Sequence, residues 1–211
     1  MKIVVNILLI ALLFVGGCGS GRAESHFRAG YNFSMLDSVA VVAVEGALKS
    51  QAARNQIAEC FEMEFLKKGY APKEWTSVAA ALEDEQVEAS ELNTDEGVAQ
   101  AGDIVNVPAV LIINIPHYGD GITITAKLVD VADGSVLWIG NGTTKTGGLF
   151  GFADGWGSRS AASENDLFGG VPGGMMGGAS SVALSPQEVD KVQRLIRRMC
   201  KTLPSRLTTE W

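Results

Sequence analysis

The sequence predicts a single α/β domain built on one mixed β-sheet. Three observations predict this fold: a valine-rich strand followed by a long amphipathic helix, three strands in succession between residues 108 and 143, and an amphipathic helix near the C-terminal end. Strands that alternate with helices and then continue as a meander are typical of a mixed sheet with helices packed on it. We expect the early helix and the C-terminal helix to cover this sheet, in a domain that spans residues 37–211.

The chain begins with a segment that is typical of export. Lys2 is followed by an apolar stretch from Ile3 to Val15, which is too short to span a bilayer and suits a secretory signal. We expect residues 1–17 to be removed. The small residues before Cys18 make this site resemble the bacterial lipobox, in which the cysteine becomes a lipidated N-terminus. The alternative is an ordinary signal peptide followed by a chance cysteine.

Lipidation of Cys18 implies a membrane anchor. Several acyl chains, palmitate among them, would hold the protein firmly, because each buried CH₂ contributes about 0.8 kcal/mol. By resemblance to lipoprotein sorting, Gly19 rather than Asp after the cysteine points to the periplasmic face of the outer membrane. We interpret residues 18–36 as a tether that keeps the domain close to this membrane.

The first half of the domain is predicted to alternate strands and helices. Ser38 to Glu45 is dense in valine, as in a buried strand, and Gly46 ends it. Ala47 to Lys68 is a predicted helix, because apolar residues recur every four positions. These residues are Ala53, Ile57, Phe61 and Phe65.

Shorter elements follow. Tyr70 to Trp75 is a short predicted strand, which Pro72 weakens because proline cannot donate a ladder hydrogen bond. Residues 76–85 and 94–103 are predicted helices, the first of them capped by Thr76 or Ser77. The acidic residues between these two helices suit a solvated surface.

The three successive strands form a predicted meander. Val110 to Ile115 is an unbroken apolar run, as expected of an interior strand covered on both faces, and Pro116 marks its end. Ile122 to Val131 alternates apolar and polar residues, as in a strand with one buried face. Asp133-Gly134 is a strong signal for a tight turn, after which residues 136–139 return as the third strand.

The last helix has the clearest signals. Ser185 and Glu188 form a capping box, with Pro186 at the first helical position. Two faces of this helix differ in character. The apolar face holds Val189, Val192, Ile196, Met199 and Leu203, and the basic face holds Lys191, Arg194, Arg197, Arg198 and Lys201.

Two cysteines remain besides Cys18. Cys60 and Cys200 each lie at the edge of the apolar stripe of a predicted helix. An even number of cysteines in an oxidising compartment favours a disulfide between them. The alternative is two separate buried thiols.

The stretch from 141 to 180 is unusual, because it holds almost half of the 25 glycines of the chain. Loops of this length are uncommon unless they are functional or disordered, and a disordered surface loop is the simplest interpretation. The functional alternative is a segment that contacts a partner or the membrane through Phe150, Phe152 and Trp156, because aromatic residues anchor interfaces.

Charge and motifs limit the possible functions. A formal net charge of −7 makes nucleic acid a poor partner, and the sequence has no polybasic patch that would hold it on anionic lipid. The two histidines, His26 and His117, are in the tether and in a turn, and no Cys/His cluster has zinc spacing. Neither a nucleotide-binding loop nor a nucleophile elbow is present. We therefore expect no catalytic residue, metal or cofactor.

The order of these parts resembles a known family. A lipobox, a valine-rich strand, a helix ending in LKKGY, a PAVLIINI strand and a DVADGSVLW hairpin are similar to the curli-secretion lipoprotein (CsgG) superfamily. That superfamily includes lipoprotein activators of penicillin-binding proteins, and its fold is shared with the N-terminal domain of TolB. The resemblance implies a periplasmic α/β domain that assembles with other proteins. The predicted tether is short for an activator that must cross the peptidoglycan layer.

Three hypotheses for function follow. The first is a non-enzymatic outer-membrane lipoprotein whose α/β domain binds and supports an envelope protein, as an accessory of secretion or cell-wall synthesis. The second is an oligomeric component of a curli-type secretion channel. The third is an enzyme that acts on envelope carbohydrate through carboxylates that no motif marks.

Overall fold

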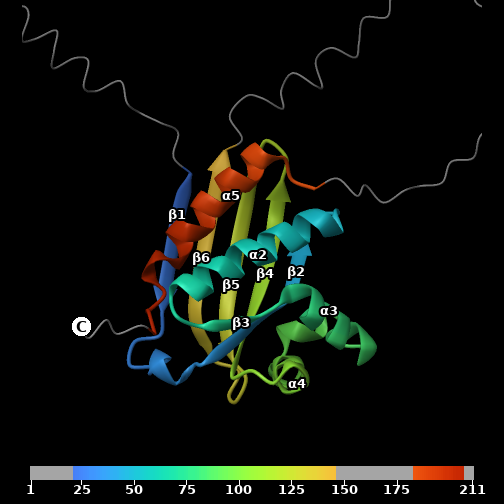
Figure 1. Ribbon diagram of the computed structural model, residues 1–211, viewed down its shortest axis with the longest axis vertical. Helices are drawn as coiled ribbons and strands as arrows, with labels where there is room; N and C mark the ends of the chain where they lie inside the picture. The colour runs from blue at the N-terminus through green and yellow to red at the C-terminus, as the bar shows by residue number, and fades with distance from the viewer. Residues whose placement is uncertain (1–20, 146–182, 207–211) are drawn as a thin grey trace, which may run out of the picture.

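The computed structural model describes residues 21–145 and 183–206, and over them it confirms the single mixed sheet. The described strands form one sheet in the order β1-β6-β5-β4-β2-β3 (Figure 1). β2 is parallel to β3 and β4, whereas β4, β5, β6 and β1 are antiparallel neighbours. The strands are β1 (Arg22–Phe27), β2 (Ser38–Gly46), β3 (Ala71–Lys73), β4 (Ala109–Tyr118), β5 (Gly121–Asp130) and β6 (Val136–Lys145).

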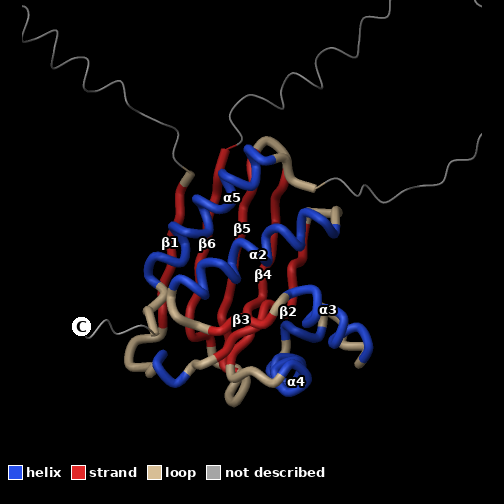
Figure 2. The backbone as a smooth tube through the Cα atoms, in the orientation of Figure 1, coloured by secondary structure: helices blue, strands red, loops and turns tan. Residues whose placement is uncertain are grey.

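Helices cover both faces of the sheet, but unequally. α2 and α5 lie side by side across one face, and α3 and α4 pack on the other face toward one end of the molecule (Figure 2). Short 3₁₀ turns connect some of these elements. The helices are α2 (Gln51–Lys67), α3 (Trp75–Asp84), α4 (Asp95–Val105) and α5 (Pro186–Met199), and the 3₁₀ turns are η1 (Phe33–Met35), η2 (Glu91–Asn93) and η4 (Cys200–Thr202).

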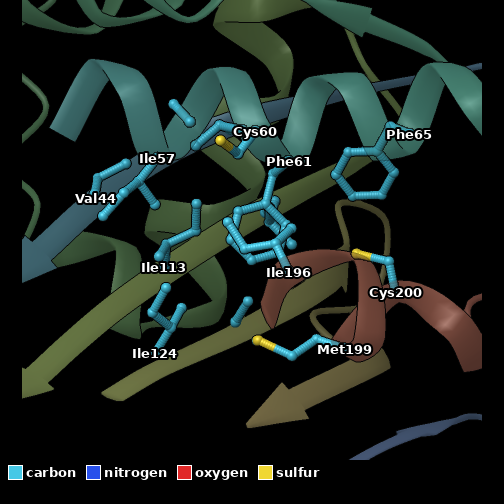
Figure 3. Packing of buried hydrophobic residues seen from close by; sticks show 14 of the residues in the cluster. Val44, Ile57, Cys60, Phe61, Phe65, Ile113, Ile124, Ile196, Met199 and Cys200 are labelled. Atoms are coloured by element: carbon cyan, nitrogen blue, oxygen red, sulfur yellow. The ribbon is translucent and has the colours of Figure 1, made fainter. Parts of the chain in front are cut away.

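The larger core lies between the sheet and the α2–α5 pair. Ile113 of β4 and Ile124 of β5 point toward Ile57 and Phe61 of α2 and Ile196 of α5, and all five side chains are fully buried (Figure 3). These are the residues that the helical and strand periodicities predict to face inward. A smaller core on the other face joins α3 and α4 to β2, β4 and the end of β5.

β6 is longer than predicted. Its glycines, which suggest a loop in the sequence, allow α5 to pack closely on the strand. The strand continues to Lys145, so residues 141–145 belong to the sheet and not to a loop; residues 146–180 lie outside the described residues. A Cβ atom at Gly142 would stand 2.7 Å from Sδ of Met199 and 2.8 Å from Cδ1 of Leu195. Glycine is therefore required here for α5 to approach the strand.

The segment predicted to be a tether contains a strand. β1 pairs antiparallel with β6 along its whole length, from Arg22 opposite Thr143 to Phe27 opposite Trp138. Residues 22–27 of the predicted tether therefore belong to the sheet and not to a free linker. The strand was missed because Ala23 and Ser25, its partly buried positions, are small and give only a weak hydrophobic signal.

Several element ends differ from the predictions. α3 begins at Trp75 and is capped by Glu74, whose carboxylate accepts hydrogen bonds from the backbone of Thr76 and Ser77. β4 continues past Pro116 with a bulge, where a proline is tolerated in a sheet. The capping box of α5 is confirmed, because both of its reciprocal hydrogen bonds are present.

Candidate functional site: a groove beside the open edge of β2

One edge of β2 is only partly paired with another strand, although Val41 to Val44 are buried. β3 pairs with Ser38, Val39 and Ala40 and then ends, whereas β4 follows the opposite edge of β2 as far as Gly46. Among the described residues, positions 41–46 therefore have no strand on the β3 side. A free strand edge presents backbone donors and acceptors to which another strand can pair.

A groove of about 870 Å³ runs along this open edge. β2 forms one wall, and the first turns of α2 together with α3 and the following loop form the others. The α3 side is mostly small and apolar, while acidic and basic side chains stand at the rim. The walls are built from Val42, Ala43, Val44, Glu45 and Gly46 of β2, from Gln51, Arg54 and Asn55 of α2, and from Trp75, Thr76, Ala79, Ala80, Leu82, Glu83, Val87, Ala89 and Leu92.

Hydrogen bonds fix the two helices that flank the groove. Nε1 of Trp75 donates to Oδ1 of Asn55 at 2.9 Å, and Nε2 of Gln51 donates to the same oxygen at 2.9 Å. Nε of Arg54 donates to the backbone oxygen of Leu48 at 2.8 Å, which holds this guanidinium at the start of α2. The groove is therefore preorganised, which lowers the entropy lost when a ligand binds.

A carboxyl group with one unsatisfied oxygen lies next to Trp75. Oε1 of Glu62 is buried and has no hydrogen-bond partner among the described residues. Burial raises the pKa of Glu62, and a backbone hydrogen bond at Trp75 opposes that rise. Glu62 is not part of the groove lining, so we assign it no role in binding.

A second exposed surface adjoins the groove. On the sheet face opposite α5, a row of polar residues crosses four strands, with Glu24, Asn141, Thr125 and Asn114 as successive neighbours. Nδ2 of Asn141 donates to Oγ1 of Thr125 at 3.2 Å. Four strands of about six residues give roughly 400 Å². That is half of the ~800 Å² that each partner contributes to a standard protein–protein interface, so this face alone is too small to form one.

The structure places some of the predicted site residues and not others. Cys18, Phe150, Phe152 and Trp156 lie outside the described residues. Both histidines are exposed, with His26 at 3.4 Å from Glu24 and His117 at 2.8 Å from Asp120.

Neither a metal site nor a membrane-spanning helix is found in the described part of the chain. Residues 21–145 and 183–206 contain no group of three or more His, Cys, Asp or Glu side chains that could hold a metal ion. None of the helices in those two ranges combines the length and the apolar character that crossing a bilayer requires.

The expected disulfide is absent from the structure. Cys60 and Cys200 are both buried free thiols. α2 and α5 do cover the same face, but Cys200 lies toward the Phe65 end of α2, whereas Cys60 lies beside Ile57 (Figure 3). The register of the two helices thus keeps the sulfurs apart.

The groove was not predicted from the sequence, although one signal for it was present. Pro72 limits β3 to a few residues, while the valine-rich run of β2 continues to Val44. A long strand beside a short one leaves an open edge. The residues that turn this edge into a groove come from α2 and α3, and their placement depends on tertiary packing.

Comparison with known proteins gives only distant similarities. No family model matches the sequence, and no curated protein matches it. Among solved structures, the PelC dodecamer from Paraburkholderia phytofirmans is 17% identical, with 63% of this chain and 89% of that chain covered and a TM-score of 0.40. The C-terminal domain of LpoB from Salmonella enterica is 14% identical, with 66% and 94% covered and a TM-score of 0.43. Lipoprotein GNA1162 from Neisseria meningitidis is 19% identical, with 56% and 91% covered and a TM-score of 0.43.

Proposed function

We propose that this chain is a non-enzymatic outer-membrane lipoprotein whose periplasmic domain binds and supports an envelope protein, by pairing an extended segment of that protein with the open edge of β2. The observation that carries this proposal is the edge of β2 at residues 41–46, which has no strand beside it in the described part of the chain and lies within a preorganised groove. Addition of a strand to an exposed sheet edge is a recurring mode of peptide recognition. The lipobox at Cys18 and the family resemblance of the sequence support the location in the envelope.

Backbone pairing alone is too weak to hold the partner. About five backbone hydrogen bonds contribute roughly 0.5–1.5 kcal/mol each, whereas association costs about 4–15 kcal/mol. Side chains of the bound segment must supply the difference by filling the apolar wall at Ala79, Ala80 and Leu92. We therefore expect a segment with apolar residues at alternate positions, because alternate side chains of a strand face the same wall.

Charge favours a basic partner. The chain carries no Lys or Arg between Glu74 and Ala126, a range that includes α3, α4 and the loop beside the groove. Glu45 and Glu83 stand in the groove lining itself, with Arg54 as its one basic side chain. A segment with Lys or Arg next to its apolar residues complements this surface and binds faster at low ionic strength.

The composition of the groove supports binding over chemistry. The residues that the structure places in its lining include no His, Cys or Ser that could act as a nucleophile or as a base at neutral pH. We accordingly expect no turnover of isolated peptidoglycan. Turnover that disappears in Glu45→Gln or Glu83→Gln would establish the enzymatic hypothesis instead.

Site-specific photo-cross-linking in cells tests the proposal. A photoreactive amino acid at Thr76, an exposed residue of the groove lining, is expected to cross-link one envelope protein. The same group at Gln100, an exposed residue of α4 outside the groove, serves as the control and is expected to give no such product. Cross-linking at Thr76 only to further copies of this chain would favour an oligomeric channel component, and no cross-link at all would contradict the proposal.

A further inference from the structure

The outer surface of α2 and α5 gathers basic side chains that are far apart in the sequence. Nζ of Lys67 and Nε of Arg197 approach the same oxygen, Oε1 of Glu64, at 2.6 Å and 3.7 Å. Nζ of Lys68 donates to the backbone oxygen of Lys201 at 3.4 Å. Glu64 is 5% exposed, so its charge is buried beneath them. This α5 basic surface consists of Lys67, Lys68, Arg194, Arg197, Arg198 and Lys201.

This surface corrects the conclusion that the chain has no polybasic patch. Four of its six residues lie on the basic face that the sequence predicts for the last helix, and Lys67 and Lys68 of α2 join them only in the fold. The net charge of the chain hid the patch as well, since acidic residues outnumber basic ones over the whole sequence.

Apolar side chains are exposed within the same surface. Leu66 is 59% exposed and Met63 is 38% exposed, both on α2. Nε2 of Gln193 on α5 lies 3.9 Å from Sδ of Met63, which places this methionine at the junction of the two helices. Basic residues interspersed with exposed apolar ones are typical of surfaces that bind the interface of an anionic membrane.

The α5 basic surface also lies where the proposed anchor enters the domain. Nη1 of Arg198 donates to the backbone oxygen of Gly21 at 2.6 Å, and β1 begins at the next residue. Gly21 is the third residue after Cys18. The four Cα–Cα steps from Cys18 to Arg22 reach at most about 14 Å, so the start of β1 lies within that distance of the lipid headgroups.

The opposite side of the sheet is the more acidic one, although α2 and α5 themselves also carry Glu59, Glu62, Glu188 and Asp190. α3 and α4 pack on the face that α2 and α5 leave free. The stretch of sequence that contains both helices, residues 74–126, has no Lys or Arg. The acidic side chains between residues 74 and 103 are Glu74, Glu83, Asp84, Glu85, Glu88, Glu91, Asp95, Glu96 and Asp103. An anionic bilayer attracts the first side of such a molecule and repels the second.

We propose that the α5 basic surface binds anionic phospholipid headgroups of the membrane that carries the anchor. The domain then lies with α2 and α5 toward the bilayer, with Leu66 at the headgroup boundary and the groove beside β2 turned toward the periplasm. This orientation rests on the anchoring at Cys18 that the proposed function includes. It explains how a domain on a very short linker keeps its partner groove accessible.

Headgroup quenching in proteoliposomes tests this orientation. The full-length lipidated protein is labelled with an environment-sensitive dye at Leu66→Cys or, as the matched control, at Ser90→Cys on the acidic side. Cys60 and Cys200 are 2% and 1% exposed and do not compete for the dye in the folded protein. Vesicles of phosphatidylcholine with phosphatidylglycerol and a nitroxide-headgroup lipid are expected to quench the dye at position 66 and not at position 90.

The dependence of quenching on lipid charge distinguishes this proposal from closeness to the membrane that the anchor alone would cause. Quenching at position 66 is expected to fall in phosphatidylcholine alone and in high salt, because salt screens exposed charges. Arg194→Gln combined with Lys201→Gln should lower the equilibrium constant for the membrane-bound orientation roughly 25-fold, or about fivefold per charge. Lys49→Gln combined with Lys127→Gln removes the same charge elsewhere and should have little effect.

Failure of the orientation and failure of the anchor give different results. Protein that does not float with the vesicles would show that Cys18 is not lipidated, which overturns the proposed function. The proposed orientation would be wrong if the protein floats with the vesicles but is quenched equally at the two positions. It would also be wrong if quenching does not depend on lipid charge. Protection of position 66 by a second copy or by an acidic protein, in place of lipid, would overturn it as well.

Discussion

The indole of Trp75 donates its hydrogen bond to the side-chain oxygen of Asn55 at 2.9 Å, and this contact joins α3 to α2 across the groove beside β2. Trp75 is 7% exposed, so its N–H is shielded from water and depends on this partner. The groove keeps its width because the two helices that flank it are tied at this point.

Trp75→Phe is expected to destabilise the domain by about 1–3 kcal/mol, because it removes a buried hydrogen bond and part of a large buried side chain. Urea unfolding measures the change. In a double-mutant cycle with Asn55→Ala, a coupling energy of about 0.5–1.5 kcal/mol is expected, since the two residues are in contact. Additive effects would show that this hydrogen bond does not join the helices.

Gly142→Ala is expected to cost about 1–3 kcal/mol, because the new methyl group meets Leu195 and Met199 at less than 3 Å in a packed core. Gly119→Ala is the matched control, since the nearest atom to its Cβ is Cε1 of His117 at 4.0 Å. Thermal unfolding of both variants tests the packing of α5 on β6. Equal stability of the two would mean that α5 is not closely packed there.

Glu62→Gln is expected to stabilise the domain at neutral pH. Burial raises the pKa of Glu62 in the folded state, so the stability linked to its proton is present below the unfolded pKa and is lost as the pH rises through the folded pKa. Glutamine keeps the neutral form at every pH. Solvent screens this half-buried group, so we expect a gain below about 1 kcal/mol at pH 7.5. Urea unfolding should show that this gain in stability becomes smaller toward pH 4. An equal gain at pH 7.5 and pH 4 would contradict the raised pKa of Glu62.

Much of the fold follows from local signals in the sequence. The capping box at Ser185 and Glu188 satisfies backbone groups within one turn of helix, so it does not depend on distant parts of the chain. The tight turn at Asp133-Gly134 was predicted for the same reason, and Gly134 indeed has a φ of +67°.

The parts that were missed depend on distant partners. β1 is held by β6 and by the hydrogen bond from Arg198 to Gly21, and its own residues give only a weak hydrophobic signal. The groove combines residues of β2, α2 and α3, and the α5 basic surface adds Lys67 and Lys68 of α2 to the basic face predicted for the last helix. Their existence depends on how those helices pack, which no single stretch of sequence reveals.

The two buried cysteines are expected to be unreactive in the folded protein and free after unfolding. Burial raises the pKa of the Cys60 thiol to about 11, and burial also raises the pKa of the Cys200 thiol, so little thiolate is present at neutral pH. Thiol labelling should therefore modify neither cysteine in native protein and both in unfolded, unreduced protein. If neither cysteine is labelled in unfolded, unreduced protein, the two must be joined by a disulfide, which would contradict this expectation.

Amide hydrogen exchange along β2, measured with and without the partner identified by cross-linking, tests the central claim most directly. If a segment of the partner pairs with the open edge, amides within residues 41–46 gain hydrogen bonds. Their exchange should then slow far more than exchange in β5 or β6. Unchanged exchange in residues 41–46, with new protection only on the polar sheet face around Asn114 and Thr125, would contradict the claim and place the partner on the uncovered face of the sheet.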